Sequence, residues 1–253
     1  MKISIITVCL NSAKTIESTI QSVLSQNYPE IEYIIIDGGS TDGTTEIINR
    51  YRPKINKVVS EKDNGIYDAI NKGILLTTGD IIGNINSDDF YASSDVIEKV
   101  VKKMVEKEAD VCWGDLVYVD RYNPDKIVRR WESSGYKDDK FKSGWMPPHP
   151  TFFVRRQVYN GYGLFNTDFK IAADYELMLR FLENHRVKSC YIPETLVKMR
   201  IGGKTQKSIR NIRNVLRYKW EDYRAWGANG LRVNPINIIF RKSFSKISQL
   251  NVR

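Results

Sequence analysis

The sequence has few residues of the kinds that build thiolate or histidine sites. It contains three cysteines, an odd number, without the paired spacing of disulfides or zinc ligands. It has only two histidines, His149 and His185, which argues against a histidine-built metal site. We therefore expect any metal ion to be held by carboxylates, and the unpaired thiols to lie in a reducing compartment.

Long apolar runs are also missing. No stretch approaches the ~18–20 apolar residues that cross a bilayer. The N-terminal run from Ile3 to Leu10 is followed at once by Asn11, Ser12 and Lys14, which predicts a buried strand rather than a signal peptide. We expect a cytoplasmic protein, or one that lies peripherally on the inner face of the cell membrane.

Acidic residues become scarce towards the C-terminus. The net charge of +9 predicts an anionic partner: a phosphorylated substrate, acidic lipid or nucleic acid. From Lys198 onward Lys and Arg recur, and Glu221 and Asp222 are almost the only acids. Nucleic acid is the weakest of the three partners because no motif that reads bases accompanies the charge.

The first third of the chain alternates strand-like and helix-like segments, which predicts an α/β fold with a mainly parallel sheet and helices on both faces. We expect a domain over 1–204, with halves 1–110 and 111–204, and a basic helical extension over 205–253. The predicted strands are Ile3–Val8, Tyr33–Ile36, Lys57–Ser60, Ile81–Ile85, Val111–Val119 and Phe152–Val154. Three helices are predicted in this domain. The first starts near Ile16, and the second follows Asp42, which is expected to cap it. The third runs from Asp174 to Leu182.

Two adjacent carboxylates, Asp88 and Asp89, directly follow the apolar run 81–85. Carboxylates suit Mg²⁺ or Mn²⁺, and substrate phosphates commonly complete the shell of Mg²⁺. A helix cap or a turn is the structural alternative for such a pair. Because ligands bind outside the carboxyl ends of parallel strands, we expect Thr7, Asp37 and Asp63 at the same edge as this pair.

Several ordered motifs together resemble family 2 glycosyltransferases of the GT-A fold, of the type that builds bacterial cell-surface polysaccharides. They cover roughly residues 1–205 and comprise the segments 4–11, 32–44, 60–73, 86–89, 149–156 and 171–180. The resemblance implies a Rossmann-like sheet and a nucleotide-diphosphate sugar as donor, which we expect to be a UDP-sugar. The implied acceptor is a hydroxyl of a glycan, which can be linked to a polyprenyl diphosphate.

The resemblance also implies roles for individual residues. Thr7 and Asp37 would contact the nucleoside, and Asp63 and Asn11 would belong to the same nucleotide-sugar pocket. The family pattern often has a second acid where this chain has Gly38, so the identity of the base stays open. A turn built on Gly38–Gly39 is the alternative explanation for Asp37.

The metal motif departs from the usual Asp-x-Asp of this fold, because Asn86 stands at its first position and Asp88 at its second. We expect Asp88 to bind Mn²⁺ or Mg²⁺ and Asn86 to contact donor hydroxyls. Asp89 would either join the metal shell or anchor the loop. By the same resemblance Asp174 is the base that takes the proton of the acceptor hydroxyl, as an inverting transfer requires.

Three further residues are candidates for contacts to the acceptor or the diphosphate. His149 lies in a loop stiffened by prolines, Arg200 precedes two glycines, and Trp145 would stack on a sugar ring. A structural role is the alternative for His149 and a core position for Trp145.

The tail over 205–253 has two helical patterns. Trp220, Tyr223 and Trp226 mark the first, and apolar residues between 236 and 247 mark the second, where Lys and Arg are interleaved. Such a pattern predicts a helix that docks on anionic lipid, or one that packs on the domain or on a second copy of the chain.

Together these features predict an inverting, metal-dependent hexosyl- or N-acetylhexosaminyl-transferase. A nucleotidyltransferase is the alternative within the enzymes, although residues 6–16 lack the glycines of its phosphate loop. A catalytically silent glycan- or lipid-binding protein is the alternative outside them.

Overall fold

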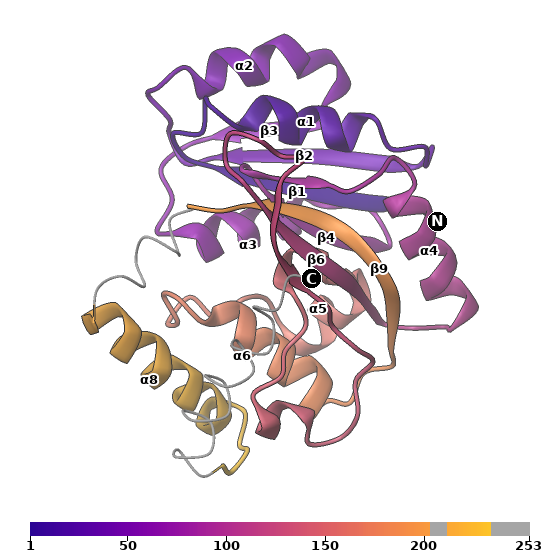
Figure 1. Ribbon diagram of the computed structural model, residues 1–253, viewed down its shortest axis with the longest axis vertical. Helices are drawn as coiled ribbons and strands as arrows, with labels where there is room; N and C mark the ends of the chain where they lie inside the picture. The colour runs from indigo at the N-terminus through magenta and orange to yellow at the C-terminus, as the bar shows by residue number, and fades with distance from the viewer. Residues whose placement is uncertain (203–211, 234–253) are drawn as a thin grey trace.

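The computed structural model describes residues 1–202 and 212–233, and in them one sheet of nine strands forms the centre of the fold (Figure 1). The strand order is β3-β2-β1-β4-β8-β6-β9-β5, and β7 pairs with β6. The strands are β1 (Ile3–Cys9), β2 (Ile31–Asp37), β3 (Lys57–Ser60), β4 (Ile81–Asn86), β5 (Asp89–Tyr91), β6 (Val111–Val119), β7 (Ile127–Trp131), β8 (Phe153–Arg155) and β9 (Ser189–Arg200). Strands β1 to β4 run parallel, as do β6 and β9, whereas β5, β7 and β8 pair antiparallel to their neighbours.

Helices cover both faces of the sheet, as the sequence predicts (Figure 1). Apolar residues of α1, α2 and α4 enter the core on one face, and those of α3, α5 and α6 enter the core on the other. The helices are α1 (Ile16–Leu24), α2 (Thr44–Tyr51), α3 (Ile66–Leu76), α4 (Val96–Glu106), α5 (Arg156–Tyr162), α6 (Ala173–Leu179) and α8 (Ile212–Ala228). A π-helical turn, Arg180–Asn184, continues α6, so the helix predicted to reach Leu182 ends close to its expected position.

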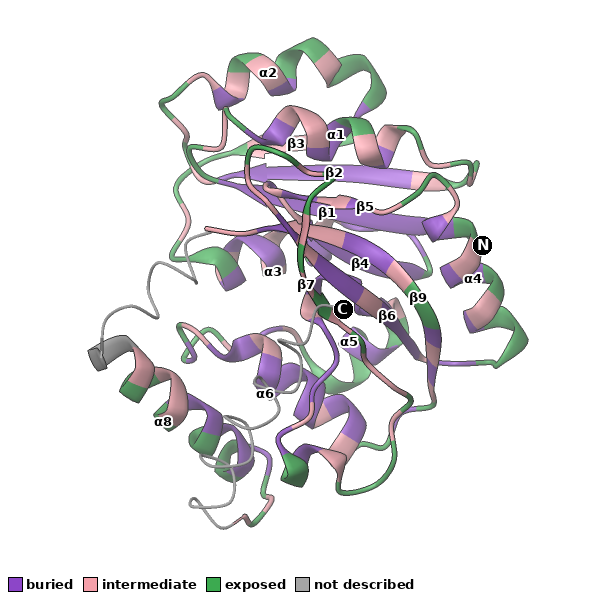
Figure 2. Cartoon of the chain, in the orientation of Figure 1, coloured by how far each residue is buried: buried purple, intermediate pink, exposed green. Residues whose placement is uncertain are grey.

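Buried β-branched residues explain why the parallel strands fall where the sequence predicts them. All seven residues of β1 and six of the seven of β2 are buried, as the colours of Figure 2 show. A strand that is buried on both faces has a continuous apolar run instead of alternation. The close packing of α3 on β1 depends on Gly73, because a Cβ there would lie 2.5 Å from Ile6 Cγ2.

The predicted cap of α2 is wrong by one residue. The N-cap is Gly43, which has a left-handed φ of 92°. Asp42 still contributes, because its carboxylate accepts hydrogen bonds from the amide and the hydroxyl of Thr44, at 3.2 and 2.5 Å. The left-handed turn moves Asp42 out of the capping position, and only glycine adopts such a φ without strain.

Helix α8 contains the first helical pattern of the tail, and it packs on the domain beside α6 (Figure 1). Trp226 is buried in the same core as α6, whereas Trp220 is 59% exposed. The second pattern, over 236–247, lies outside the described residues, and the boundary at 204/205 stays a prediction.

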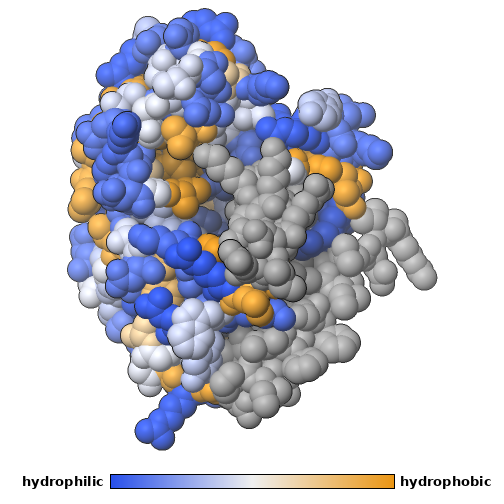
Figure 3. Space-filling model, turned by 90° about the vertical axis from the view of Figure 1, so that its left-hand side faces the viewer, coloured by the Kyte–Doolittle hydropathy of each residue, from blue (hydrophilic) through white to orange (hydrophobic). Residues whose placement is uncertain are grey.

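In the part of the chain that the structure describes, no helix combines the length and the apolarity needed to cross a bilayer. Figure 3 shows one face of the molecule, on which the coloured apolar residues form separate patches among hydrophilic ones.

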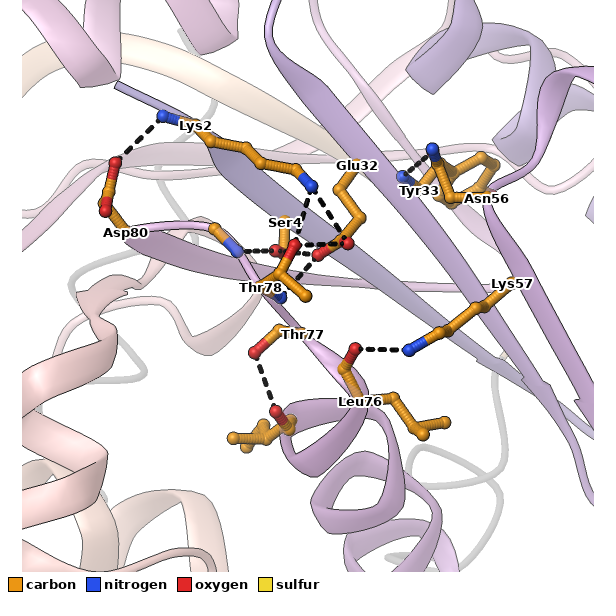
Figure 4. Close-up of polar contacts among 12 residues, drawn as sticks. Lys2, Ser4, Glu32, Tyr33, Asn56, Lys57, Leu76, Thr77, Thr78 and Asp80 are labelled. Carbon is orange, nitrogen blue, oxygen red and sulfur yellow. Dashed lines mark hydrogen bonds and ion pairs between the residues drawn. The ribbon is translucent and has the colours of Figure 1, made fainter.

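The amino ends of the parallel strands are joined by a buried carboxylate, Glu32 (Figure 4). It accepts hydrogen bonds from Ser4 Oγ at 2.6 Å, from Thr78 N and Oγ1 at 2.7 Å each, and from Lys2 Nζ at 3.1 Å. Burial raises the pKa of Glu32, but these hydrogen bonds outweigh that effect and lower the pKa to about 2. This network stabilises the edge of the sheet opposite to the one where the candidate site lies.

All three cysteines are buried and free. Cys112 and Cys190 are far apart in the sequence, but they are register partners on β6 and β9. Sequence distance does not predict this pairing, because a parallel pair brings together segments that a long connection separates.

Candidate active site

The carboxyl ends of β1, β2, β3 and β4 meet at one edge of the sheet. Cys9 pairs with Asp37, Asp37 with Ser60, and Val8 with Asn86. The loops that follow these ends carry most of the candidate residues, so the structure brings together segments as far apart in the sequence as Val8 and Asn86. In open α/β sheets this edge is where ligands bind.

Hydrogen bonds join the loops at this edge. The amide of Asn11 donates to Ser40 Oγ at 2.8 Å, and Asn11 Oδ1 accepts from the amide of Thr41 at 2.9 Å. Ser12 and Ser87 share a hydroxyl–hydroxyl bond of 2.8 Å, which connects the loop after β1 to the loop after β4. Asn11 has a left-handed φ of 53°, which asparagine adopts more readily than most residues. The predicted role of Asn11 in the nucleotide pocket stays a prediction.

Asp37 and Thr7 are both fully buried. The carboxylate of Asp37 accepts from Ser60 Oγ at 2.6 Å and from the amide and the hydroxyl of Ser40. Burial raises its pKa, but these hydrogen bonds outweigh that effect and lower it. Thr7 Oγ1 bonds to the hydroxyl of Tyr33 at 3.0 Å. Both side chains organise the strand ends, and their predicted contacts with a nucleoside stay predictions.

Asp63 lies directly against the turn after β2. A Cβ at Gly38 would be 3.1 Å from Asp63 Oδ2, so glycine at this position makes the close approach possible. Lys72 Nζ pairs with Asp63 at 2.7 Å, with Glu61 at 2.9 Å and with Asp68 at 3.5 Å. One cation on α3 therefore holds three carboxylates beside the predicted nucleotide pocket.

Asn86, Asp88 and Asp89 form a tight turn at the end of β4. Asn86 Nδ2 donates to Asp89 Oδ2 at 2.9 Å, and Asp89 is fully buried at the start of β5. Burial, followed by the neighbouring charge of Asp88, raises the pKa of Asp89 well above its ordinary value. Asp88 is partly exposed. Of the two roles expected for Asp89, this geometry favours that of an anchor for the loop.

Arg200, at the end of β9, holds the same turn. Its Nη1 donates to the carbonyl of Asp88 at 2.9 Å and its Nη2 to Ser18 Oγ at 3.0 Å. The guanidinium stacks over the ring of Phe90, 4.6 Å from the ring centroid, and the residue is only 7% exposed. These contacts make Arg200 a residue that orders the turn after β4, and its predicted contact with diphosphate stays a prediction.

The donor set of this turn fits a divalent cation that shares its shell with a substrate. Among the described residues no group of three His, Cys, Asp or Glu side chains could hold a metal ion alone. Mg²⁺ is commonly bound through one or two protein carboxylates, with water and phosphate oxygens completing the shell. Asp88 offers such a carboxylate, and Asp89 Oδ1 beside it is a buried oxygen without a hydrogen-bond partner.

Asp174 lies in the first turn of α6, as predicted, beside residues from two other segments. Its Oδ1 accepts from the Tyr67 hydroxyl at 3.3 Å and from the amide of Tyr175 at 2.9 Å. His149 is close enough that the charge of Asp174 raises the pKa of the imidazole, but burial is the larger effect and lowers it. The structure thus brings together Asp174 and His149, which are 25 positions apart in the sequence.

Trp145 is partly buried and packs against the core. Its ring packs against Trp113, Phe141 and Tyr136, with centroid distances of 5.8, 5.5 and 6.1 Å. Lys140 Nζ lies 4.6 Å from the centroid of the same ring. These contacts give Trp145 a packing role, and its predicted stacking on a sugar ring stays a prediction.

Sequence reasoning did not single out Tyr67 or Lys72 as site residues. Both belong to the 60–73 motif, in which the neighbouring acids are the more obvious candidates because carboxylates can bind a ligand directly. Tyr67 hydrogen-bonds Asp174, and Lys72 pairs with Asp63. For Lys72 the available signal was its spacing of four from Asp68 on the same helix. For Tyr67 no local signal existed, because its partner lies on a distant segment.

Comparison with known proteins identifies the family. The family model described as glycosyl transferase family 2 matches residues 4–163, and the chain belongs to this family. An uncharacterized glycosyltransferase of Mycobacterium tuberculosis is 32% identical over 184 residues, which cover 70% of this chain and 68% of the relative. A PGL/p-HBAD biosynthesis glycosyltransferase of the same organism is 29% identical over 196 residues, covering 75% and 73%. The chain is therefore a glycosyltransferase, and both alternatives raised from the sequence are set aside.

Solved structures show that the fold is of the GT-A type. Staphylococcus aureus TarS 1-349 aligns over 98% of this chain and 72% of its own, with a TM-score of 0.68 and 18% identity. The mannosyltransferase PcManGT of Pyrobaculum calidifontis, in complex with GDP-Man and Mn²⁺, aligns over 98% and 70%, with a TM-score of 0.67 and 17% identity. Asp174 and α8 lie beyond the residues that the family model matches.

Proposed function

We propose that this glycosyltransferase moves a sugar from a nucleotide-diphosphate donor, a UDP-sugar, to a hydroxyl of a glycan acceptor with inversion. The observation that carries the proposal is the turn at the end of β4, where the partly exposed Asp88 follows Asn86 at the ligand-binding edge of the sheet. TarS has been solved in complex with UDP and with UDP-GlcNAc, which supports a uridine donor. PcManGT has been solved with GDP-Man, so a GDP-sugar is the alternative donor to a UDP-sugar.

Asp88 would hold Mn²⁺ or Mg²⁺, and Asp89 and Asn86 would keep the loop in place. When bound, the ion supplies positive charge beside the departing diphosphate. The complex of PcManGT with Mn²⁺ supports a metal of this kind.

Asp174 would take the proton of the acceptor hydroxyl while the new bond forms. Its carboxylate is partly exposed at the start of a helix, and Tyr67 and Tyr175 hold it through hydrogen bonds to Oδ1. Desolvation lowers the pKa of the His149 imidazole below its ordinary value, so the ring is neutral at pH 7 and would not neutralise the charge of Asp174. The acceptor would be a hydroxyl of a surface glycan, which can be linked to a polyprenyl diphosphate.

Calorimetric titration tests the donor and the metal together. We expect UDP to bind in Mn²⁺ more tightly than GDP does, and EDTA to weaken that binding. A panel of UDP-glucose, UDP-galactose, UDP-GlcNAc and GDP-mannose, with release of the nucleotide as readout, then identifies the sugar. Asp88→Asn should remove the metal effect, whereas Asp125→Asn, the same change on an exposed loop, should preserve it. Binding of UDP that is indifferent to EDTA and to Asp88→Asn would disprove the metal assignment.

A further inference from the structure

The segment that leads into Asp174 is held from two sides by distant parts of the chain. From α3, the Tyr67 hydroxyl donates to the carbonyl of Ile171 at 2.7 Å. From α8, Glu221 Oε2 accepts from the amide of Ile171 at 2.8 Å and from the amide of Ala172 at 3.0 Å. Ala172 is the N-cap of α6 and makes no side-chain cap of its own. Glu221 therefore supplies, from another helix, hydrogen bonds that this helix start does not supply itself.

Glu221 is an unusual residue for its position in the sequence. It is one of two acids in a basic tail, yet its side chain is only 3% exposed. A buried carboxylate is costly unless hydrogen bonds or an opposite charge compensate for the lost hydration. The two amides compensate for it by donating hydrogen bonds to Oε2. Arg217 compensates for it through an ion pair, with 3.1 Å between its Nε and Oε1 of Glu221. The contacts of Glu221 are thus made almost entirely with the segment before Asp174 and with one arginine of its own helix.

Two further polar contacts to α6 come from later positions, one from α8 and one from Asn229, which follows the helix. Trp226 Nε1 donates to the hydroxyl of Tyr175 at 3.0 Å, and Asn229 Nδ2 donates to Glu176 Oε1 at 3.2 Å. Figure 2 shows the buried part of α8 beside α6. These contacts attach α8 to side chains of α6, whereas Glu221 bonds to the backbone amides immediately before Asp174.

We propose that Glu221 is a positioning residue that fixes the direction of the Asp174 carboxylate from the tail helix. The proposal rests on the proposed function of Asp174 as the base. Removing the carboxylate leaves two amides, that of Ala172 buried and that of Ile171 partly buried, without an acceptor, so the backbone at 171–172 would move to find water or another partner. A displacement of about 1 Å at a reacting group can cost ~10²-fold in rate. Binding of the donor, which takes place at the carboxyl ends of β1 to β4, should not change.

The experiment compares three variants of the full chain. Glu221→Ala removes both hydrogen bonds, Glu221→Gln keeps an oxygen that can accept them, and Asn229→Ala removes a contact between α8 and α6 elsewhere. The readouts are kcat for release of the nucleotide from the donor that the panel identifies, the Kd for UDP with Mn²⁺, and the Tm. We expect Glu221→Ala to lower kcat ~10–100-fold with an unchanged Kd. Glu221→Gln should recover most of kcat, and Asn229→Ala should lower the Tm but not kcat.

Two outcomes would overturn the proposal. One is a folded Glu221→Ala protein with the kcat of the wild type. The other is an equal loss of kcat in Asn229→Ala, which would mean that α8 acts only through general packing. If Glu221→Ala does not fold, Glu221→Asp gives the same comparison, because it keeps the charge and withdraws the acceptor from the amides. A wild-type protein that turns over no nucleotide sugar, or full activity in Asp174→Asn, would instead show that the proposed function itself is wrong.

Discussion

At the scale of single residues, the two adjacent carboxylates after β4 have different surroundings, although they look equivalent in the sequence. Asp88 is partly exposed, and its carbonyl is held by Arg200. Asp89 is fully buried and accepts a hydrogen bond from Asn86. A ligand that approaches this edge therefore meets the side chain of Asp88 first, and the two residues should respond differently to substitution.

We predict that Asp88→Asn abolishes sugar transfer, because it removes the carboxylate that is available to a metal ion. Asp89→Asn should have a milder effect, since an amide can fill the same buried volume and keep an oxygen for Asn86. Rates of nucleotide release over a range of Mn²⁺ concentrations measure both effects. An equal loss of activity in the two variants would contradict this assignment.

Asp174→Asn should lower kcat by ~10²–10⁴-fold and leave the affinity for UDP nearly unchanged, because the carboxylate acts on the acceptor and does not bind the donor. The asparagine can still accept from Tyr67 and from the amide of Tyr175, so the fold should persist. Single-turnover rates, UDP titration and thermal melting separate the possibilities. A lower Tm together with weaker UDP binding would indicate a structural role instead.

At the scale of the elements, the buried Glu32 connects β1, β2 and the segment before β4, and it predicts a pH dependence of stability. Hydrogen bonds lower its pKa in the folded state to about 2, from 4.5 in an unfolded chain. A lowered pKa contributes stability that is fully present above pH 4.5 and is lost as the pH falls towards 2. The shift corresponds to at most roughly 3 kcal/mol.

We therefore predict that Glu32→Gln lowers the free energy of unfolding at pH 7, and that the difference from the wild type shrinks between pH 5 and pH 2. Urea unfolding at several pH values provides the measurement. Glu30→Gln is a matched control, because Glu30 is exposed at the same end of β2. A difference that stays constant down to pH 2 would show that Glu32 is not charged in the folded protein at neutral pH.

The elements also show what the sequence can predict and what it cannot. The strand Lys57–Ser60 and the strand Val111–Val119 match their predicted bounds, because apolar runs between turn residues identify a strand locally. Strand β7 lies in a segment that looks merely polar, since only part of its surface is buried. The contact of Glu221 with the segment before Asp174 depends on how two distant helices pack, and no local pattern contains that information.

The candidate site also has features that the sequence could predict and features that it could not. The acids at strand ends could be predicted, because the carboxyl ends of parallel strands share an edge. The sequence could not predict whether each acid faces a ligand or the protein. Asp37 and Asp63 have different surroundings because other segments supply their partners, Ser60 for Asp37 and Lys72 for Asp63.

At the scale of the whole molecule, positive charge is concentrated towards the C-terminus. The chain has a net charge of +9, and residues 234–253 contain four Lys or Arg and no acid. This segment lies outside the described residues, so its role is argued from the sequence alone. Trp220 and Leu216 on α8 are exposed near it in the chain, at 59% and 62%. An anionic membrane surface fits this combination of charge and exposed apolar side chains, because each Lys or Arg near such a surface contributes ~1 kcal/mol.

We predict that the full chain co-sediments with vesicles that contain anionic phospholipid, and that a chain ending at Val233 does not. Ending at Val233 keeps Trp226 and Asn229, which attach α8 to α6, so the fold and the UDP affinity should be preserved. Co-sedimentation should weaken between 50 and 300 mM salt, because the Debye length falls from roughly 14 to 6 Å over that range. Neutral vesicles are the control for apolar adsorption. If the full chain never sediments with anionic vesicles and the shortened chain loses its fold or its oligomeric state, the segment packs on protein, and the membrane assignment is wrong.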